Sequence, residues 1–162
     1  EIVEATRLSA DAVRRFGETP KIALLSHSNF GSRATPTALK MQAAMKILRE
    51  ENPELEVEGE MQADAALDEI IRNRVFPDSK LTGQANLLIF PNLEASNTAF
   101  NLLKVLGNGL PVGPMLLGTA KPVHILTSAV TSRGIINMSA LAVVDAQSRN
   151  DDDAAAYVLS IS

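Results

Sequence analysis

The sequence predicts an α/β fold in which helices cover both faces of a mostly parallel sheet. Residues 22–25 and 87–90 are runs of apolar side chains, which is typical of strands buried on both faces. Segments with helical spacing of apolar residues alternate with these strands. Because this alternation builds parallel sheets, we expect a layered α/β/α domain. The length of 162 residues suits one domain or two small lobes.

The first segment has a helical pattern. Ser9 is a suitable N-terminal cap for a short helix over residues 10–16, and Gly17 is a suitable end. The chain starts at Glu1 inside a pattern that is already helical. We therefore expect it to be a piece of a longer protein.

A loop rich in hydroxyl groups, residues 26–34, follows the first strand. Thr35 then caps a second helix, with Pro36 at its first position. Apolar residues at helical spacing predict one buried face on this helix: Ala38, Met41, Met45 and Leu48.

Residues 55–61 alternate between apolar and acidic side chains, which predicts a strand with one polar face. The acidic residues are Glu54, Glu56, Glu58 and Glu60. Paired carboxylates can form an acid–base site, but this alternation favours a face exposed to solvent.

The middle of the chain predicts a helix at 62–74, a polar loop at 77–84 and a strand at 87–90. A further helix begins after Asn92 and ends at the Gly-Asn-Gly sequence 107–109. In the first helix, the residues expected to point inward are Ala63, Ala66, Leu67, Ile70 and Ile71. The second helix carries Ala99, Leu102, Leu103 and Leu106.

Residues 112–117 and 123–126 are predicted to be short strands. A last helix opens at Thr131 or Ser132 and carries Ile136, Ala140, Val143 and Val144 on one face. We divide the chain into a domain at 1–147 and a tail at 148–162.

Composition excludes several classes of protein and site. The absence of cysteine excludes disulfides and thiolate metal sites, and is compatible with a cytoplasmic protein. A net charge of -4 and 4% aromatic residues argue against a nucleic-acid partner. No apolar run reaches the ~20 residues of a membrane span. His27 and His124 are too few and too distant to predict a metal site.

Two segments are candidates for binding an anion. The loop at 26–33 places hydroxyl groups and a guanidinium before a helix N-terminus, and its candidate ligands are Ser26, Ser28, Gly31, Ser32 and Arg33. The alternative is a loop whose hydroxyl groups cap its own backbone. The second segment is 113–133, where Lys121 contacts either a phosphate or water.

Five stretches, in order and at matching spacing, resemble the phosphate acetyl/butyryltransferase family. They are SHSNFGS (26–32), EVEGEMQADAAL (56–67), PDSKLTGQANLLIFPNLEASN (77–97), GPMLLGTAKPV (113–123) and IINMSALAVVDAQ (135–147). The resemblance implies the second lobe, with a closing segment, of a two-lobed α/β enzyme that moves acetyl groups between phosphate and coenzyme A.

The reactive residues of the family pattern are replaced in this chain. The resemblance implies a serine-arginine pair and then an aspartate base after Lys121, but these slots hold Thr127, Ser128 and Gly134. Arg133 is nearby but out of register. Losing such a base typically costs ~10²–10⁴ in rate.

The altered segment is similar to the carboxy-terminal domain of bacterial hybrid NADP-dependent malic enzymes. That resemblance implies a domain without acetyl transfer that binds acetyl-CoA as a regulator and helps form homo-oligomers. The implied ligand residues are Lys121, Thr127, Ser128 and Arg133, together with the loop at 26–33. NADP and a divalent metal are expected only in an upstream domain in cis.

Two other functions remain open at this point. An active phosphate acetyltransferase needs a different base, for which the candidates are His124, Asp64 or a residue outside this chain. A structural module would use its helices to pair two copies.

Overall fold

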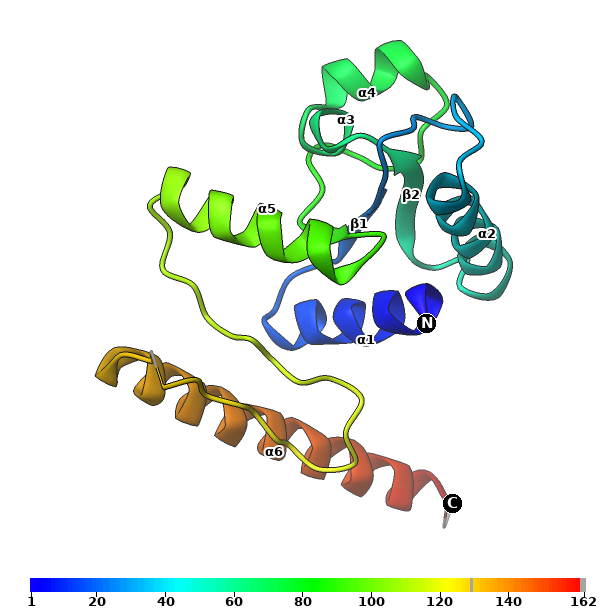
Figure 1. Ribbon diagram of the computed structural model, residues 1–162. Helices are drawn as coiled ribbons and strands as arrows, with labels where there is room; N and C mark the ends of the chain where they lie inside the picture. The colour runs from blue at the N-terminus through cyan, green and yellow to red at the C-terminus, as the bar shows by residue number, and fades with distance from the viewer. Residues whose placement is uncertain (129, 161–162) are drawn as a thin grey trace. The chain divides into compact units, whose positions relative to one another are not determined.

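The computed structural model describes residues 1–128 and 130–160 (Figure 1). The chain divides into two compact units, unit 1 (Glu1–Gly107) and unit 2 (Asn108–Ser162). The elements of unit 1 are α1 (Ile2–Arg15), β1 (Lys21–Leu25), α2 (Pro36–Glu51), β2 (Glu56–Met61), α3 (Ala63–Leu67), α4 (Glu69–Val75), β3 (Leu87–Ile89) and α5 (Leu93–Leu106).

Unit 1 contains a parallel sheet with the strand order β2-β1-β3. Ile22 of the central strand pairs with Val57 on one side and with Leu87 on the other. The predicted parallel α/β fold is therefore confirmed. Strand β1 is the central strand, with β2 on one side and β3 on the other.

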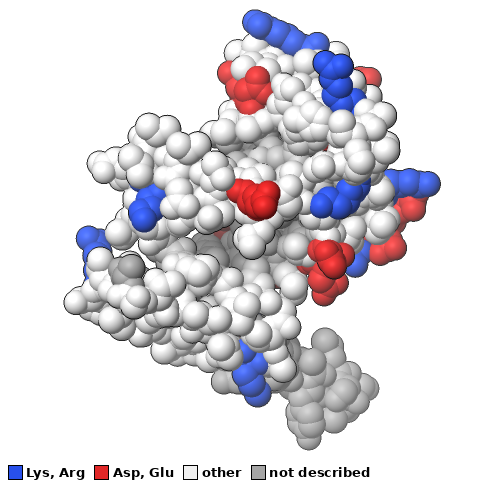
Figure 2. Space-filling view, viewed as in Figure 1, with Lys and Arg blue, Asp and Glu red and all other residues white. Residues whose placement is uncertain are grey.

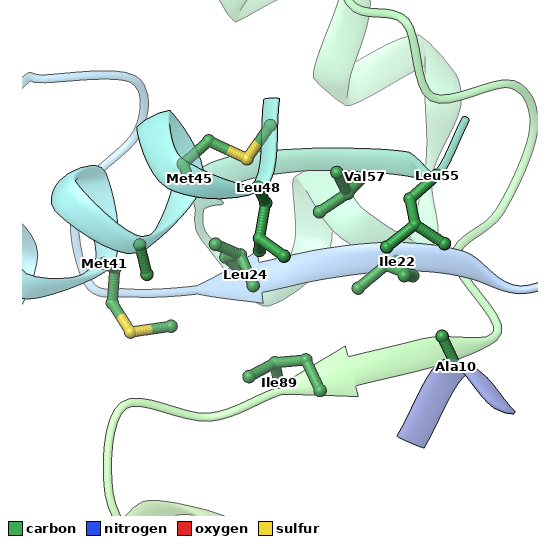
Figure 3. Packing of buried hydrophobic residues seen from close by; sticks show 10 residues of the cluster. Ala10, Ile22, Leu24, Met41, Met45, Leu48, Leu55, Val57 and Ile89 are labelled. Carbon is green, nitrogen blue, oxygen red and sulfur yellow. The ribbon is translucent and has the colours of Figure 1, made fainter. Parts of the chain in front are cut away.

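Side chains along β1 point alternately to the two faces of the sheet, so each face presents apolar residues against which helices pack. Ile22 and Leu24 join a cluster that includes residues of α1 and α2 (Figure 3). Ala23 and Leu25 join a second cluster, with Ala65 and Ala66 of α3. The predicted buried face of α2 is confirmed in full, and Thr35 Oγ1 accepts a hydrogen bond from Ala38 N at 3.4 Å.

The first helix is longer than predicted. It begins at Ile2, so Ser9 lies inside it and caps nothing. Thr6, which is fully buried, donates its hydroxyl proton to the Ile2 carbonyl. Such a bond to the preceding turn allows a hydroxyl residue to occupy a helix interior.

The helix predicted at 62–74 is broken in two at Asp68. This residue has an extended backbone, with φ -131° and ψ 112°, and both ends α3 and begins α4. Its Oδ1 accepts hydrogen bonds from Ile70 N and Ile71 N, at 2.8 and 3.1 Å. An aspartate can compete in this way with a continuous helix because its side chain satisfies free N–H groups. The break leaves Ala63, Leu67 and Ile70 exposed instead of inward.

Replacing Asp68 by alanine is expected to lower the free energy of unfolding by about 1 kcal/mol, because α4 loses its N-terminal cap. Urea unfolding of the chain measures this change. Asp78→Ala removes an exposed acid from the loop that follows α4, and should stay within about 0.5 kcal/mol of the parent.

Helix α5 begins and ends as predicted. None of its residues is buried in the part of the chain that the structure describes. Asn92 Oδ1 accepts a hydrogen bond from Ala95 N at 2.9 Å, and Gly107 follows the last turn. Leu102 and Leu103 are each 56% exposed, and Leu106 is 80% exposed. The leucines of α5 therefore present an apolar surface to solvent.

Unit 2 consists of an irregular segment that runs beside a long helix, α6 (Ser132–Ser160) (Figure 1). The strands predicted at 112–117 and 123–126 are wrong, because neither range forms strand structure. Pro111, Pro114 and Pro122 lack the N–H donor that a sheet ladder needs. Helix α6 starts where predicted, and Thr131 Oγ1 accepts a hydrogen bond from Gly134 N at 3.1 Å. Its backbone stays helical beyond residue 147.

The surface of the described residues carries charges of both signs. On the face shown in Figure 2, acidic and basic side chains are intermixed and form no continuous basic area. Among the described helices, none combines the length and apolar character that crossing a bilayer requires.

Candidate functional site

The candidate site lies where β1 ends and its chain continues into the loop 26–35. The backbone pins this loop to the end of β2: Ser26 N donates to Met61 O at 2.8 Å, and Phe30 N donates to Glu60 O at 2.7 Å. The loop then enters α2, whose first N–H groups lack backbone partners inside the helix. The sheet and one helix N-terminus therefore hold the loop at a position where α/β proteins commonly bind ligands.

Most hydroxyl groups of the loop bond within the protein. Ser26 Oγ accepts from Ser28 N at 3.1 Å, and Ser32 Oγ accepts from Asn29 N at 2.9 Å. Ser28 is fully buried, and its Oγ donates to Glu60 Oε1 at 2.7 Å while accepting from Arg33 N at 3.0 Å. Ser28 thus organises the loop from inside, and the ligand surface is left to its exposed neighbours.

Three other candidate residues are exposed on the loop. Gly31 has a left-handed backbone with φ +83°, and its N–H donates to Glu60 Oε1 at 2.9 Å. Ser32 and Arg33 are exposed, so both can meet a ligand from solvent. His27 is also exposed, with Nε2 3.4 Å from Thr35 Oγ1.

The expectation that the glutamates of β2 face solvent is wrong for Glu58 and Glu60, which are 0% and 1% exposed. The pairing of β1 with β2 is irregular between Leu24 and Leu25, whose partners are Gly59 and Met61. Glu60 is therefore the extra residue of a bulge, and Val57 and Met61 pack in different clusters. A glycine inside a strand pattern can indicate such a bulge, and Gly59 was the signal in the sequence.

Each buried carboxylate is held by several donors, which offsets the cost of removing its charge from water. Glu58 Oε1 pairs with the Arg49 guanidinium, and its Oε2 accepts from Lys80 N at 3.0 Å. Glu60 Oε1 accepts from Ser28, from Gly31 and, at 3.2 Å, from Gln42 Nε2. Glu60 thereby joins β2, α2 and the loop into one polar centre.

Arg72 is a second organising residue that the sequence did not reveal. Its side chain is fully buried, and its guanidinium donates to the carbonyls of Ala65, Leu81 and Gly83 at 3.0, 2.8 and 2.7 Å. Glu69 Oε1 lies 3.7 Å from the same group. Arg72 therefore ties α3 and α4 to the predicted loop at 77–84.

The remaining candidate ligands belong to unit 2. Lys121, Thr127, Ser128 and Arg133 are all exposed. Thr119 Oγ1 donates to the Lys121 carbonyl at 2.7 Å, and Val130 N donates to the Thr127 carbonyl at 3.1 Å. The candidates thus form two sets, one on the loop of unit 1 and one in unit 2.

The candidate bases differ in their surroundings. Asp64 is exposed in the first turn of α3, where its Oδ1 accepts from Ala65 N at 2.8 Å. The His124 side chain is 5% exposed, its Nε2 lies 4.0 Å from Asp145 Oδ2, and neither ring nitrogen has a hydrogen-bond partner. Across the part of the chain that the structure describes, no three His, Asp or Glu side chains cluster closely enough to hold a metal ion.

Comparison with known proteins gives two kinds of relative. Residues 1–143 match the family model described as phosphate acetyl/butaryl transferase. The NAD-dependent malic enzyme of Rhizobium meliloti is 54% identical over 90% of this chain, and the NADP-dependent malic enzyme of Escherichia coli is 53% identical over 92%. The chain spans only 19% and 20% of those two proteins.

The solved structure of a phosphotransacetylase from Streptococcus pyogenes is also similar. It superposes with a TM-score of 0.82 at 34% identity, over 90% of this chain and 44% of that one.

Proposed function

Because the chain belongs to the phosphate acetyl/butaryl transferase family, we propose that it is the transferase-like carboxy-terminal domain of a cytoplasmic NADP-dependent malic enzyme. In this proposal the domain binds acetyl-CoA as a regulator, performs no acetyl transfer and contributes to oligomer assembly. The observation that carries the proposal is the identity of 53–54% to malic enzymes over at least 90% of the chain.

The proposed phosphate ligands of acetyl-CoA are exposed residues of unit 2. Lys121 and Arg133 are exposed cations that would pair with the phosphates, and Thr127 and Ser128 are exposed hydroxyls in the same unit. In unit 1, the loop at 26–32 is proposed separately as a binding segment for an acyl group. Ser28, whose hydroxyl is committed to Glu60, would hold the loop in shape.

The proposed lack of acetyl transfer follows from the chemistry at residue 134. Attack of a thiol on an acyl group needs a base, and the family pattern supplies an aspartate where this chain has Gly134. A Cβ built at Gly134 would lie 2.8 Å from Val130 Cγ2, so a larger residue at 134 requires the Val130 side chain to move. His124, whose ring nitrogens are enclosed, is poorly placed as a substitute.

Substituting Lys121 or Arg133 by alanine should weaken acetyl-CoA binding to the full-length protein about tenfold each, because each substitution removes a charge-assisted contact to phosphate. Isothermal titration calorimetry measures the affinities. Lys104→Ala in α5 is the matched control, since it removes an exposed cation that belongs to neither set. If the Lys121 and Arg133 variants bind acetyl-CoA as tightly as the parent and the Lys104→Ala control, the placement of the phosphates is refuted.

The second candidate function is an active phosphate acetyltransferase, favoured by the likeness to solved phosphotransacetylases. A coupled assay for acetyl phosphate formation from acetyl-CoA and phosphate separates the two functions. We expect the full-length protein to give no turnover above a control reaction without protein. Clear turnover that is lost in His124→Ala or Asp64→Asn would establish the second function and identify its base.

The oxidation of malate would take place elsewhere in the longer protein. The proposal assigns NADP and a divalent metal to an upstream domain, because this chain spans only about a fifth of the malic enzymes that it resembles. The exposed leucines of α5 and the exposed Val105, at 75%, are suited to burial against another protein surface. Analytical ultracentrifugation of the full-length protein tests assembly, and a strict monomer at high concentration would contradict it.

A further inference from the structure

A cavity of about 470 Å³ lies in unit 1 beside the buried carboxylates of β2. Its lining comes from α2, from β2, from the loop after β1 and from Phe76 at the end of α4. The size is within the range of small-molecule sites. Phe30 and Gly31 of the lining belong to the loop at 26–33, whereas the polar side chains of the cavity belong to none of the candidate ligand sets.

Glu60 presents a free hydrogen-bond acceptor in this cavity. Its Oε1 takes three hydrogen bonds, from Ser28, Gly31 and Gln42, whereas its Oε2 accepts none from the described residues. The side chain lines the cavity although the residue is 1% exposed. A carboxylate oxygen that faces a cavity without a donor from the protein is stabilised by an N–H group or a positive charge that enters.

The other charges of the lining are already paired. Arg49 donates to the buried Glu58, and Lys46 Nζ lies 4.0 Å from Glu50 Oε1 on the exposed side of α2. Each cation of the lining thus has a carboxylate partner other than Glu60, and Glu60 has no ion-pair partner among the described residues. The cavity therefore favours a ligand with one positive charge.

Apolar and aromatic side chains form the rest of the wall. The rings of Phe30 and Phe76 stack with their centroids 4.4 Å apart and an interplanar angle of 19°. Met45 lines the cavity with them. Aromatic rings and a polarisable thioether next to a carboxylate are suited to an alkyl chain that carries a cation.

We propose that this cavity binds a small organic cation, an ammonium or guanidinium group on a short alkyl chain. The charged group donates to Glu60 Oε2, and the alkyl part lies against Phe30, Phe76 and Met45. This proposal does not depend on acetyl-CoA binding, and either can fail without the other.

Saturation-transfer NMR with the full-length protein tests the proposal, with n-butylammonium and n-butylguanidinium chloride as probes at constant ionic strength. Both should bind saturably, and sodium butyrate should not. Glu60→Gln keeps an acceptor for the three internal donors but places an NH₂ group toward the ligand, so we expect at least tenfold weaker binding. Glu18→Gln removes one exposed negative charge outside the cavity and should leave the affinity unchanged.

Phe76→Leu provides a second variant that leaves the polar centre intact. It should weaken both cations severalfold, with the circular dichroism spectrum of the parent retained. Failure of both cations to bind the folded parent would overturn the proposal. Preferential binding of butyrate, or equal cation affinity in the parent and in folded Glu60→Gln, would also overturn it.

Discussion

Replacing Arg72 by methionine is expected to lower the free energy of unfolding by about 4 kcal/mol. Methionine fills much of the same space but donates no hydrogen bond, so the carbonyls of Ala65, Leu81 and Gly83 lose a buried donor. Each unsatisfied buried group costs about 1–3 kcal/mol. An apolar residue cannot compensate here, since the partners are backbone groups that the substitution leaves in place.

Urea unfolding of the chain measures this loss as a lower transition midpoint at an unchanged slope. Arg74→Met is the matched control because Arg74 is exposed in the same helix. It should change the free energy by less than about 0.5 kcal/mol. A similar small change for Arg72→Met would mean that the guanidinium does not organise α3, α4 and the following loop.

Gly59→Ala is the second substitution expected to be severe, at about 4 kcal/mol. Gly59 has φ +143°, a conformation that side chains with a Cβ rarely adopt, and strain of this kind costs about 1–3 kcal/mol. The added Cβ would also lie 2.7 Å from the Leu24 carbonyl oxygen and 3.0 Å from Leu24 Cβ, so β1 and β2 must separate. Overpacking adds about 1–3 kcal/mol.

Gly31→Ala separates these two causes. Gly31 also has a positive φ, of +83°, but nothing lies within 4 Å of an added Cβ. Its expected cost is about 1 kcal/mol, from backbone conformation alone. Thermal unfolding of both variants checks the comparison, and equal losses would show that the contact with Leu24 is not the main cause of the destabilisation.

The sequence predicted the parts of the fold that depend on local patterns. Apolar runs located β1 and β3, and Thr35 with Pro36 located the start of α2. Asp68 is itself a local signal for the break, because aspartate commonly caps a helix. The helical spacing of apolar residues on both sides of it nevertheless favoured one continuous helix. Three prolines, at 111, 114 and 122, argued against strands in a segment whose apolar character suggested them.

The polar centre could not be predicted from local patterns because its partners are far apart in the chain. Glu60 is buried through a bulge in β2 and through donors at Ser28, Gly31 and Gln42. Arg72 is buried because three carbonyls from separate segments converge on it. A local sequence pattern places charged residues such as these on the solvent face. Only the tertiary structure brings together the donors and carbonyls that stabilise them when buried.

The loop at 26–33 contains residues that support the fold and residues that face solvent. Ser28 and Gly31 serve the polar centre around Glu60, whereas Ser32 and Arg33 are exposed. In the proposed regulatory domain the family scaffold persists while the reactive slots at residues 127, 128 and 134 have changed. In the proposal, a coenzyme A ester binds to the retained scaffold, and acetyl transfer is lost with the changed residues at 127, 128 and 134.

Calorimetric titration of the full-length protein with acetyl-CoA tests the proposed regulatory function most directly. We expect a saturable heat, and a change in the rate of malate oxidation over the same range of acetyl-CoA concentration. A folded full-length protein that gives neither heat nor saturation would contradict the assignment of this domain as an acetyl-CoA-binding regulator.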